Sequence, residues 1–214
     1  MVWETEDELI NKFNNSVFIN CPFDNEYYPI LRPLLFTILF LGYIPRIALE
    51  DSDCGQPRLE KLLKLISQSR YSIHDLSRVQ AIKKNEFYRL NMPFELGIDY
   101  GCRCFAANNH VSKRFLILEK ESYRYMKALS DINGLDIKSH KNDPQELVKS
   151  VRNWFVETVK IKNVKSPTII WYRFNDFYGS LYDLKTSEGF TIEEIDFMPI
   201  PELIDNMKSW IERN

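Results

Sequence analysis

The hydrophobic pattern of the first two-thirds of the chain alternates short β-branched runs with longer apolar segments of helical period. The strand-like runs lie at 16–23, 43–49, 70–77 and 113–119, with a short extended piece at 136–140. The helix-like segments lie at 26–42, 57–69, 92–103, 122–132 and 142–160. This β-α-β-α order predicts an α/β fold, in which a parallel sheet is flanked by helices on both faces.

Two of the predicted helices differ in which of their sides are apolar. Segment 26–42 is apolar nearly all round, so we expect it to be buried between the sheet and another surface, such as a second subunit. Segment 57–69 begins with Pro57 at the first helical position. Its predicted apolar stripe consists of Leu59, Leu62, Leu63 and Ile66.

Composition changes at 160–168, KIKNVKSPT, and the pattern beyond it is that of helices alone. An aromatic-rich segment of helical spacing is followed by two shorter helical segments joined by a Pro-x-Pro turn. We therefore divide the chain into an α/β domain, 1–162, and a small C-terminal helical subdomain, 163–214, packed on it.

The composition is that of a soluble globular protein, with 44% hydrophobic and 27% charged residues. The net charge is −2 and no basic block is present, so we do not expect direct binding of nucleic acid. The cysteines and histidines lack metal-ligand spacing, which predicts largely buried free thiols and no metal. The most apolar run, 33–45, is too short to cross a membrane, and the N-terminal segment lacks the layout of a signal peptide. We expect a cytoplasmic protein.

Residues with chemically useful side chains gather after the predicted strands, and ligands of open parallel sheets bind at the carboxyl ends of strands. These segments supply an acid-rich rim that also bears hydroxyl, amide and aromatic groups: Asn20, Phe23, Asp24, Arg46, Glu50, Asp51, Asp53, Asp75, Ser77, Arg78, Asn91 and Glu95. Neither G-x-G-x-x-G nor G-x-x-x-x-G-K-[ST] occurs, which disfavours an ordinary dinucleotide or P-loop site.

Several rim residues have structural alternatives. Asp75, at the end of a strand, is as well suited to capping a turn as to binding a ligand. His74 points to the opposite face of that strand because side chains alternate, which favours a structural histidine over a base. The acids around Asp53 can form a solvated loop. Arg46 lies in an otherwise apolar strand, where a buried guanidinium needs an anionic partner.

Glu95 is the strongest candidate for catalysis. Asn91 is a suitable N-cap, which places Glu95 in or just past the first helical turn, where the helix dipole favours a carboxylate. Such an acid can serve the helix alone, yet Phe94 beside it is apolar and Gly97 leaves room for a ligand. Asp99 lies one turn further, so the two acids share either the solvent face of the helix or the face of a site.

Three segments taken together resemble the TIR-like, nucleoside 2-deoxyribosyltransferase-like superfamily. They are VFINCPFDNEYY (17–28), RYSIHDLSRV (70–79) and LNMPFELGIDYG (90–101). The shared features are a Pro-Phe-acid loop after the first strand, Asp-Leu-Ser after a later strand, and an Asn-x-x-Phe-Glu-Leu-Gly helix start. The resemblance covers residues 16 to 119.

The resemblance implies a flavodoxin-like Rossmannoid sheet and the cleavage or exchange of an N-glycosidic bond at the C1′ carbon of a ribose. It gives Glu95 the role of nucleophile or stabiliser of an oxocarbenium-like transition state, which requires the carboxylate that a helix N-terminus keeps ionised. Asp75 would orient the ribose or base, Phe23 would stack on a ring, and Arg46 would meet a phosphate. The predicted substrate-binding residues are Phe23, Asp24, Arg46, Asp53, Asp75, Ser77 and Asn91.

The segment YRLNMPFELG (88–97) is closer to the TIR-like members than to the transferases, which favours NAD as substrate, with no separate cofactor. We therefore expect an NAD glycohydrolase that acts as a homo-oligomer in bacterial antiphage defence, together with an upstream partner. One alternative is a non-catalytic module of the same fold that binds a nucleotide signal. Another is a structural protein that interacts through helix 26–42 and the aromatic C-terminal segment.

Overall fold

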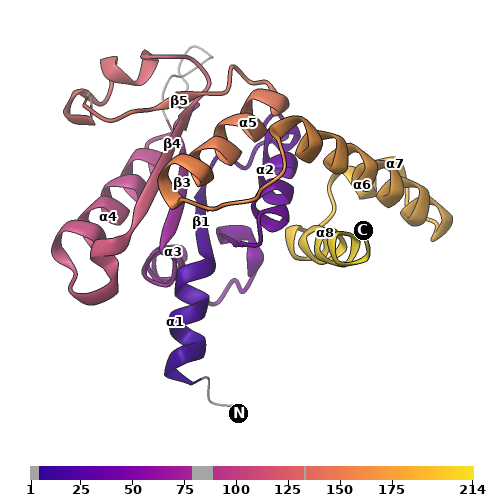
Figure 1. The fold of residues 1–214 in the computed structure, drawn as a ribbon, viewed down its shortest axis with the longest axis horizontal. Helices are drawn as coiled ribbons and strands as arrows, with labels where there is room; N and C mark the ends of the chain where they lie inside the picture. Colours follow the sequence, from indigo (N-terminus) through magenta and orange to yellow (C-terminus); the bar gives the residue numbers. More distant parts are fainter. Residues whose placement is uncertain (1–4, 79–88, 133) are drawn as a thin grey trace.

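The computed structural model describes residues 5–78, 89–132 and 134–214, and these contain one parallel sheet of order β2-β1-β3-β4-β5 (Figure 1). The strands are β1 Ser16–Asn20, β2 Ile44–Ile47, β3 Tyr71–Asp75, β4 Arg114–Glu119 and β5 Lys138–Ser139. Helices cover both faces of the sheet, so the predicted α/β fold is confirmed. The strand order changes direction between β1 and β3, which makes this pair the switch point of the sheet.

The helices follow the predicted segments in most places. They are α1 Glu6–Asn15, α2 Tyr28–Phe40, α3 Arg58–Ser67, α4 Asn91–Phe105, α5 Pro144–Trp154, α6 Pro167–Ser187, α7 Ile192–Asp196 and α8 Ile200–Arg213. Shorter turns are η1 Ala48–Glu50, η2 Asn108–Ser112, η3 Arg124–Lys127, η4 Ser130–Ile132 and the π-helical η5 Phe155–Val159. The single helix predicted at 122–132 is wrong, because η3 and η4 form there. Within η3 and η4 only Tyr125 is buried, which is too little packing to support a longer helix.

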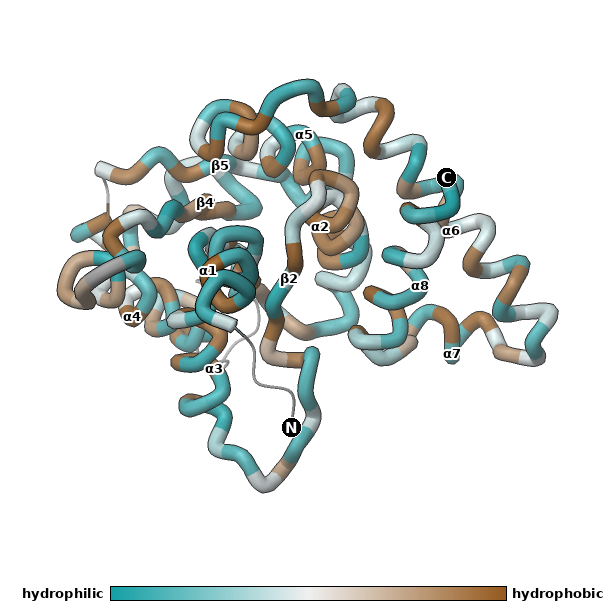
Figure 2. The backbone as a smooth tube through the Cα atoms, turned by 60° about the horizontal axis from the view of Figure 1, so that its bottom comes forward, coloured by the Kyte–Doolittle hydropathy of each residue, from teal (hydrophilic) through white to brown (hydrophobic). Residues whose placement is uncertain are grey.

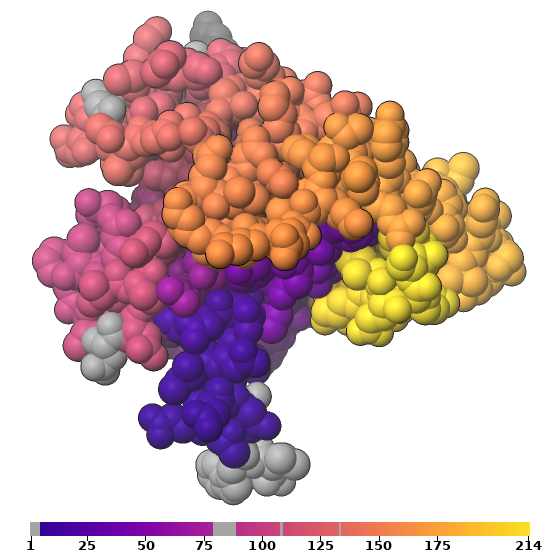
Figure 3. All heavy atoms as spheres, in the orientation of Figure 1, coloured from indigo at the N-terminus to yellow at the C-terminus, as the bar shows by residue number. Residues whose placement is uncertain are grey.

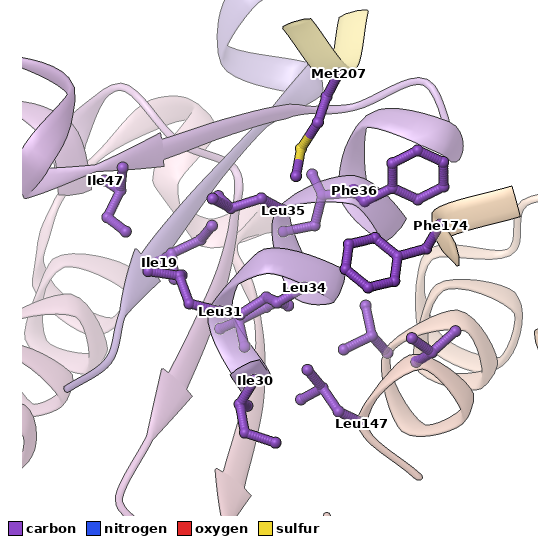
Figure 4. Packing of buried hydrophobic residues seen from close by; sticks show 14 of the residues in the cluster. Ile19, Ile30, Leu31, Leu34, Leu35, Phe36, Ile47, Leu147, Phe174 and Met207 are labelled. Carbon is purple, nitrogen blue, oxygen red and sulfur yellow. The ribbon is translucent and has the colours of Figure 1, made fainter. Parts of the chain in front are cut away.

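Helix α2 is enclosed on one face of the sheet by apolar side chains from several elements (Figure 4). Its Phe36 ring lies 5.7 to 6.0 Å from the rings of Phe174, Phe177 and Trp210, which belong to α6 and α8. Helix α5 packs beside α2 as well. The expected second surface over this helix therefore exists, but it is the C-terminal part of the same chain rather than a second subunit.

The C-terminal helices α6 to α8 share one apolar cluster with the sheet and with α2 and α5. Figure 2 shows these three helices together at one end of the molecule. Hydrogen bonds also connect α2 to these helices: Arg32 of α2 donates to the Asp196 carbonyl and the Tyr178 hydroxyl. The Tyr182 hydroxyl donates to the Asp196 carboxylate at 2.5 Å. The three predicted C-terminal helices are present, while the division of the chain at 162/163 stays a prediction.

Helices α3 and α4 cover the opposite face of the sheet with fewer apolar contacts. The cluster beneath α3 consists of Phe18, Leu62, Leu65 and Ile66. The predicted α3 stripe is half wrong, because Leu59 and Leu63 are 46% and 44% exposed whereas Leu65 is buried. Adjacent leucines allow two overlapping stripes on this helix, and contact with the sheet selects the stripe that contains Leu65.

The apolar pattern does not predict α1, which extends from the body of the molecule (Figure 3). Thr5 and Glu8 form a capping box, in which the Glu8 carboxylate accepts the Thr5 N–H at 2.7 Å and the Thr5 hydroxyl accepts the Glu8 N–H at 3.3 Å. Only Phe13 of this helix is buried. The start of α1 is thus encoded by capping rather than by periodicity.

The four cysteines are free, but the expectation that they are largely buried is wrong. Cys21 is buried, Cys102 is partly buried, and Cys54 and Cys104 are exposed because they lie in a surface loop and near the end of α4. Among the described residues, no helix combines the length and apolar character that crossing a membrane requires.

Candidate functional site

Strands β1 and β3 end side by side at the carboxyl edge of the sheet, and the chain leaves them toward opposite faces (Figure 1). In open α/β sheets, ligands bind outside the carboxyl ends of the strands at such a switch point. We use the term crevice for this location, between the residues that surround the ends of β1 and β3. The Cys21 thiol, directly after β1, is buried there. Burial raises the pKa of Cys21 well above its usual value, and the charges of Asp75, Glu95 and Asp24 act in the same direction. Three of the predicted carboxylates therefore lie around the end of β1.

Glu95 lies on the inward face of α4 and is only 3% exposed. Asp99 shares this face and is fully buried, whereas Phe94 is 56% exposed. The two acids therefore do not form the solvent face of the helix. The prediction that Asn91 caps α4 is wrong: Leu90 occupies the N-cap position and Asn91 is the first helical residue. Glu95 consequently lies just past the first turn.

A buried polar network around Asp99 fixes how α4 is turned against the sheet. The Asp99 carboxylate accepts the Ser72 hydroxyl, lies 3.0 Å from His74 Nε2, and forms an ion pair with Lys113 Nζ at 3.0 Å. All four side chains are 0% exposed. Burial acts to raise the pKa of Asp99, but the hydrogen bonds and charges of its partners outweigh it and hold that pKa below the usual value.

Asn20 joins this network to the first strand. Its Nδ2 donates to the Met92 carbonyl at 2.8 Å and lies 3.0 Å from His74 Nδ1. His74 thus faces α4 while Asp75 faces the other side of the sheet, as the strand alternation predicts. The interpretation of His74 as a structural histidine is supported by these buried contacts.

Arg58, the first residue of α3, lies beside Glu95 of α4 and beside Phe23 after β1. Its Nη2 lies 3.8 Å from Glu95 Oε1, and its guanidinium carbon lies 5.8 Å from the centre of the Phe23 ring. The Arg58 side chain is 54% exposed. Phe23 and Glu95, which come from separate motifs, therefore meet through a residue that the sequence does not single out. The only signal for Arg58 is a cation at the start of a helix that follows a strand.

The Glu95 carboxyl has no hydrogen-bond donor within the residues that the structure describes. Burial raises the pKa of Glu95 from 4.5 to about 7, and the charge of Arg58 opposes this rise only in part. The expectation that the helix start keeps Glu95 fully ionised is wrong. The dipole acts mainly within the first turn, and the loss of hydration outweighs it at this position. Near neutral pH Glu95 can therefore accept or release a proton.

His140, which the sequence pattern does not indicate, organises the other side of the crevice. Its Nε2 lies 3.0 Å from both Asp75 Oδ2 and Ser77 Oγ, and its Nδ1 accepts the Asn142 N–H at 3.1 Å. That bond leaves the proton of a neutral imidazole on Nε2, where it faces the carboxylate. The left-handed backbone of Lys141 and Asn142, with φ of 54° and 57°, delivers this N–H.

Asp75 is fully buried and already has several donors. The Tyr27 hydroxyl donates to it at 2.6 Å and the Ser77 N–H at 2.8 Å, so Asp75 does cap the turn after β3. Burial acts to raise the pKa of Asp75, but its hydrogen bonds to His140, Ser77 and Tyr27 hold that pKa below the usual value. Its contact with a substrate stays a prediction, as does that of Ser77, which is 6% exposed.

Asp24 forms a two-point ion pair with Arg78, with distances of 2.8 and 3.1 Å, and Arg89 lies 3.8 Å away. Burial acts to raise the pKa of Asp24, but these arginines lower it below the usual value. Asp24 thus ties the loop after β1 to the residues that follow β3 and precede α4.

Arg46 and Asp53 are not joined to Glu95 by a contact among the described residues. Arg46 has the anionic partner that its position requires, since Glu50 accepts its Nε and Nη2 at 3.0 and 2.8 Å. Asp53 is exposed and accepts the Gly55 N–H at 2.9 Å within a turn. Substrate contacts of Arg46, Asp53 and the exposed Asn91 stay predictions.

Within residues 5–78, 89–132 and 134–214, no three His, Cys, Asp or Glu side chains are grouped to hold a metal ion. Comparisons with protein-family models, curated proteins and solved structures find no match. The class of the protein therefore rests on its fold: a parallel α/β protein with a nucleotide-binding-like architecture and an acidic crevice at the switch point of its sheet.

Proposed function

We propose that this protein cleaves the N-glycosidic bond of a nucleotide, with the nicotinamide–ribose bond of NAD as the leading candidate. The observation that carries the proposal is Glu95, a nearly buried carboxyl at the switch point with no hydrogen-bond donor in the described residues and a pKa of about 7. Groups held out of water with perturbed pKa values concentrate at functional sites. The motif resemblance to TIR-like proteins supports the choice of NAD.

The reaction needs one carboxylate and one water molecule. The C1′–N bond breaks with its electron pair going to the nicotinamide nitrogen, which becomes neutral, while positive charge develops on C1′ and the ring oxygen. Ionised Glu95 stabilises this charge or bonds to C1′. Water then adds to C1′ and loses a proton, which the carboxylate can accept. The products are nicotinamide, the ribosyl product and one proton.

The leaving group of NAD suits the environment of Glu95. Nicotinamide departs as a neutral molecule and needs no general acid, so ionised Glu95 alone can support the reaction. The cationic ring of bound NAD would favour that ionised form over the protonated form. In the free protein at low pH, protonated Glu95 would be inactive, so kcat/KM should rise as pH increases through about 7.

The test is nicotinamide release from NAD by the purified wild type, Glu95→Gln and Glu193→Gln. Glu193 lies exposed in the first turn of α7, so its variant removes the same charge away from the crevice. We expect Glu95→Gln to lower kcat by about 10²- to 10⁴-fold and Glu193→Gln to stay near wild type. Equal release by all three folded proteins would remove Glu95 from the mechanism.

The near-complete burial of Glu95 also favours a second function, a module that binds a nucleotide signal without cleaving it. A thermal shift with NAD, together with no nicotinamide at high protein concentration, would support this alternative over catalysis. If the protein is instead a regulated effector in antiphage defence, assembly into a homo-oligomer or an upstream partner would open the crevice. In that case release of nicotinamide should increase more than in proportion to protein concentration.

A further inference from the structure

Arg58 is an exposed arginine at the carboxyl edge whose guanidinium lies beside both Glu95 and Phe23. Its side chain is 54% exposed, and its only ion pair among the described residues is with Glu95, at 3.8 Å. This distance is too long for a hydrogen bond. We propose that Arg58 is the phosphate-binding residue of this crevice and selects a 5′-phosphorylated substrate over the free nucleoside. The inference rests on the proposed function, because it assumes that Glu95 faces the C1′ carbon.

Two other arginines near this edge have stronger partners, and a third, Arg89, pairs with Asp24 rather than with Glu95. Arg46 is held by two short contacts to Glu50, and Arg78 by two to Asp24 and one to Glu26. A phosphate would have to displace these hydrogen bonds before it could bind either guanidinium. Arg58 would give up only one long ion pair, so its desolvation and exchange cost less.

The backbone around Arg58 adds to the positive potential. Pro57 occupies the N-cap position of α3 and offers no capping side chain. The first intrahelical bond runs from the Lys61 N–H to the Pro57 carbonyl. Within the described residues, the N–H groups of Arg58, Leu59 and Glu60 have no acceptor. These groups and the helix dipole favour an anion near the N-terminus of α3, the helix that Arg58 begins.

The environment of Glu95 is a second observation that points to a ligand at this location. The side chain of Glu95 is 4% exposed, its carboxyl faces Arg58, and the carboxyl has no hydrogen-bond donor in the described residues. In a nucleoside 5′-phosphate, one furanose ring separates C1′ from the phosphate-bearing carbon. A substrate with C1′ at Glu95 would therefore bring its 5′-phosphate to a neighbouring cation, and Phe23 beside Arg58 offers an aromatic face for a ring.

Two acids oppose a phosphate at this place. Glu95 itself repels it when ionised, and exposed Glu60 lies in the same helical turn as Arg58. The pKa of about 7 means that Glu95 carries only part of a negative charge near neutral pH. When Arg58 moves from Glu95 to the phosphate, the cationic ring of the bound substrate takes its place as the counter-charge of ionised Glu95.

The experiment compares nicotinamide mononucleotide with nicotinamide riboside, which differ by one 5′-phosphate. Dissociation constants are measured by calorimetry in the Glu95→Gln background, where cleavage does not interfere. We expect the mononucleotide to bind about 10- to 100-fold more tightly than the riboside, as a charge-assisted phosphate contact would give. In this background, Arg58→Gln should remove the preference for the mononucleotide. Arg58→Lys in its place should keep part of that preference.

Arg89→Gln is the matched control. Its side chain is 48% exposed and lies 3.8 Å from a carboxylate, Asp24, so it removes a comparable cation from the same edge. The preference for the phosphate should survive this change. If Arg58→Gln and Arg89→Gln reduce the preference for the mononucleotide equally, the phosphate is attracted by the general positive charge of this edge, and the assignment is overturned. The assignment is also overturned if Arg58→Gln keeps the full preference, or if the Glu95→Gln protein shows none.

Nicotinamide release by the wild-type protein is followed separately. An Arg58-dependent preference without release would refute the proposed cleavage and uphold the phosphate site. Release from both compounds, with a preference that ignores Arg58, would uphold cleavage and refute the phosphate site. Melting temperatures of all variants confirm that each is folded.

Discussion

The face of the sheet under α2 and α5 is held by hydrocarbon packing that α6 and α8 extend, whereas the face under α4 combines a smaller apolar cluster with buried hydrogen bonds and an ion pair. On the first face, Phe36 packs among rings from α6 and α8. On the second face, the four apolar residues Leu76, Met92, Leu96 and Ile117 form a separate small cluster. The Asp99 network lies beside it.

The two faces contribute differently: apolar packing mainly stabilises the fold, whereas the polar network fixes the orientation of side chains. Apolar packing is non-directional, so it stabilises α2 without demanding one orientation of each side chain. Hydrogen bonds require particular atoms at particular distances, and buried charges lose much hydration unless they are paired. Asp99 and Glu95 share one face of α4, so the network that holds Asp99 also sets the direction of Glu95.

The largest expected effect comes from Asp99→Asn, which preserves shape but leaves the buried Lys113 ammonium without its counter-charge. We expect the free energy of unfolding to fall by about 3–5 kcal/mol, measured by urea denaturation. The double variant Asp99→Asn/Lys113→Met removes both charges and should recover more than half of this loss. A loss below about 1 kcal/mol in the single variant would show that this face does not depend on the ion pair.

The second effect is a pH dependence caused by Glu95. Between pH 4.5 and about 7, the folded protein keeps a proton that the unfolded chain has released. The stability that this proton provides is complete below pH 4.5 and is lost as pH rises through about 7. We expect wild type to lose on the order of 2–3 kcal/mol more than Glu95→Gln between pH 4.5 and 8. The free energy of unfolding of both proteins is measured by urea denaturation at each pH. If it changes with pH by the same amount in the two proteins, the raised pKa of Glu95 is contradicted.

A smaller effect is expected for Phe36→Leu on the apolar face. The leucine keeps the site apolar and removes part of the ring packing, so the loss should be about 1–2 kcal/mol by urea denaturation. The comparison with Asp99→Asn is the informative result, since the conservative change on the polar face should cost more than this one. A larger loss of unfolding free energy in Phe36→Leu than in Asp99→Asn would show that apolar packing, and not the ion pair, contributes most to stability.

The smallest effect is expected for Leu63→Ala in α3, whose side chain is 44% exposed. The change should alter stability by less than about 0.5 kcal/mol in thermal or urea unfolding. Leu62→Ala, one residue earlier and 5% exposed, is the control and should cost about 2–4 kcal/mol. Similar losses in the two variants would mean that α3 buries both positions.

Much of the carboxyl edge follows from local sequence rules. Phe23 and Asp75 lie at the ends of strand-like runs and Glu95 lies near the start of the helix that follows the second of them, and in a parallel sheet such positions meet at one edge. The opposite directions of His74 and Asp75 follow from strand alternation alone. The aromatic spacing of the C-terminal segment likewise predicts α6, although it does not reveal that α6 covers α2.

Other residues of the candidate site have no local signal. Arg58 and His140 are far from Glu95 along the chain, and neither belongs to a motif. Helix α4 is a sharper case, because the sequence leaves open whether Glu95 and Asp99 share the solvent face or the face of a site. The bonds that Asp99 forms with Ser72, His74 and Lys113 turn both acids inward.

The sequence by itself determined the strands and most of the helices along the chain, the α/β class and the presence of acids at one edge, because these depend on backbone periodicity and on short-range turn and capping preferences. Only the tertiary structure decided which faces of α3 and α4 are buried, which partner each charge has, and how far the pKa of Glu95 is raised. These properties depend on which surfaces meet and on how much water they exclude, and neither is encoded in any one segment of the chain.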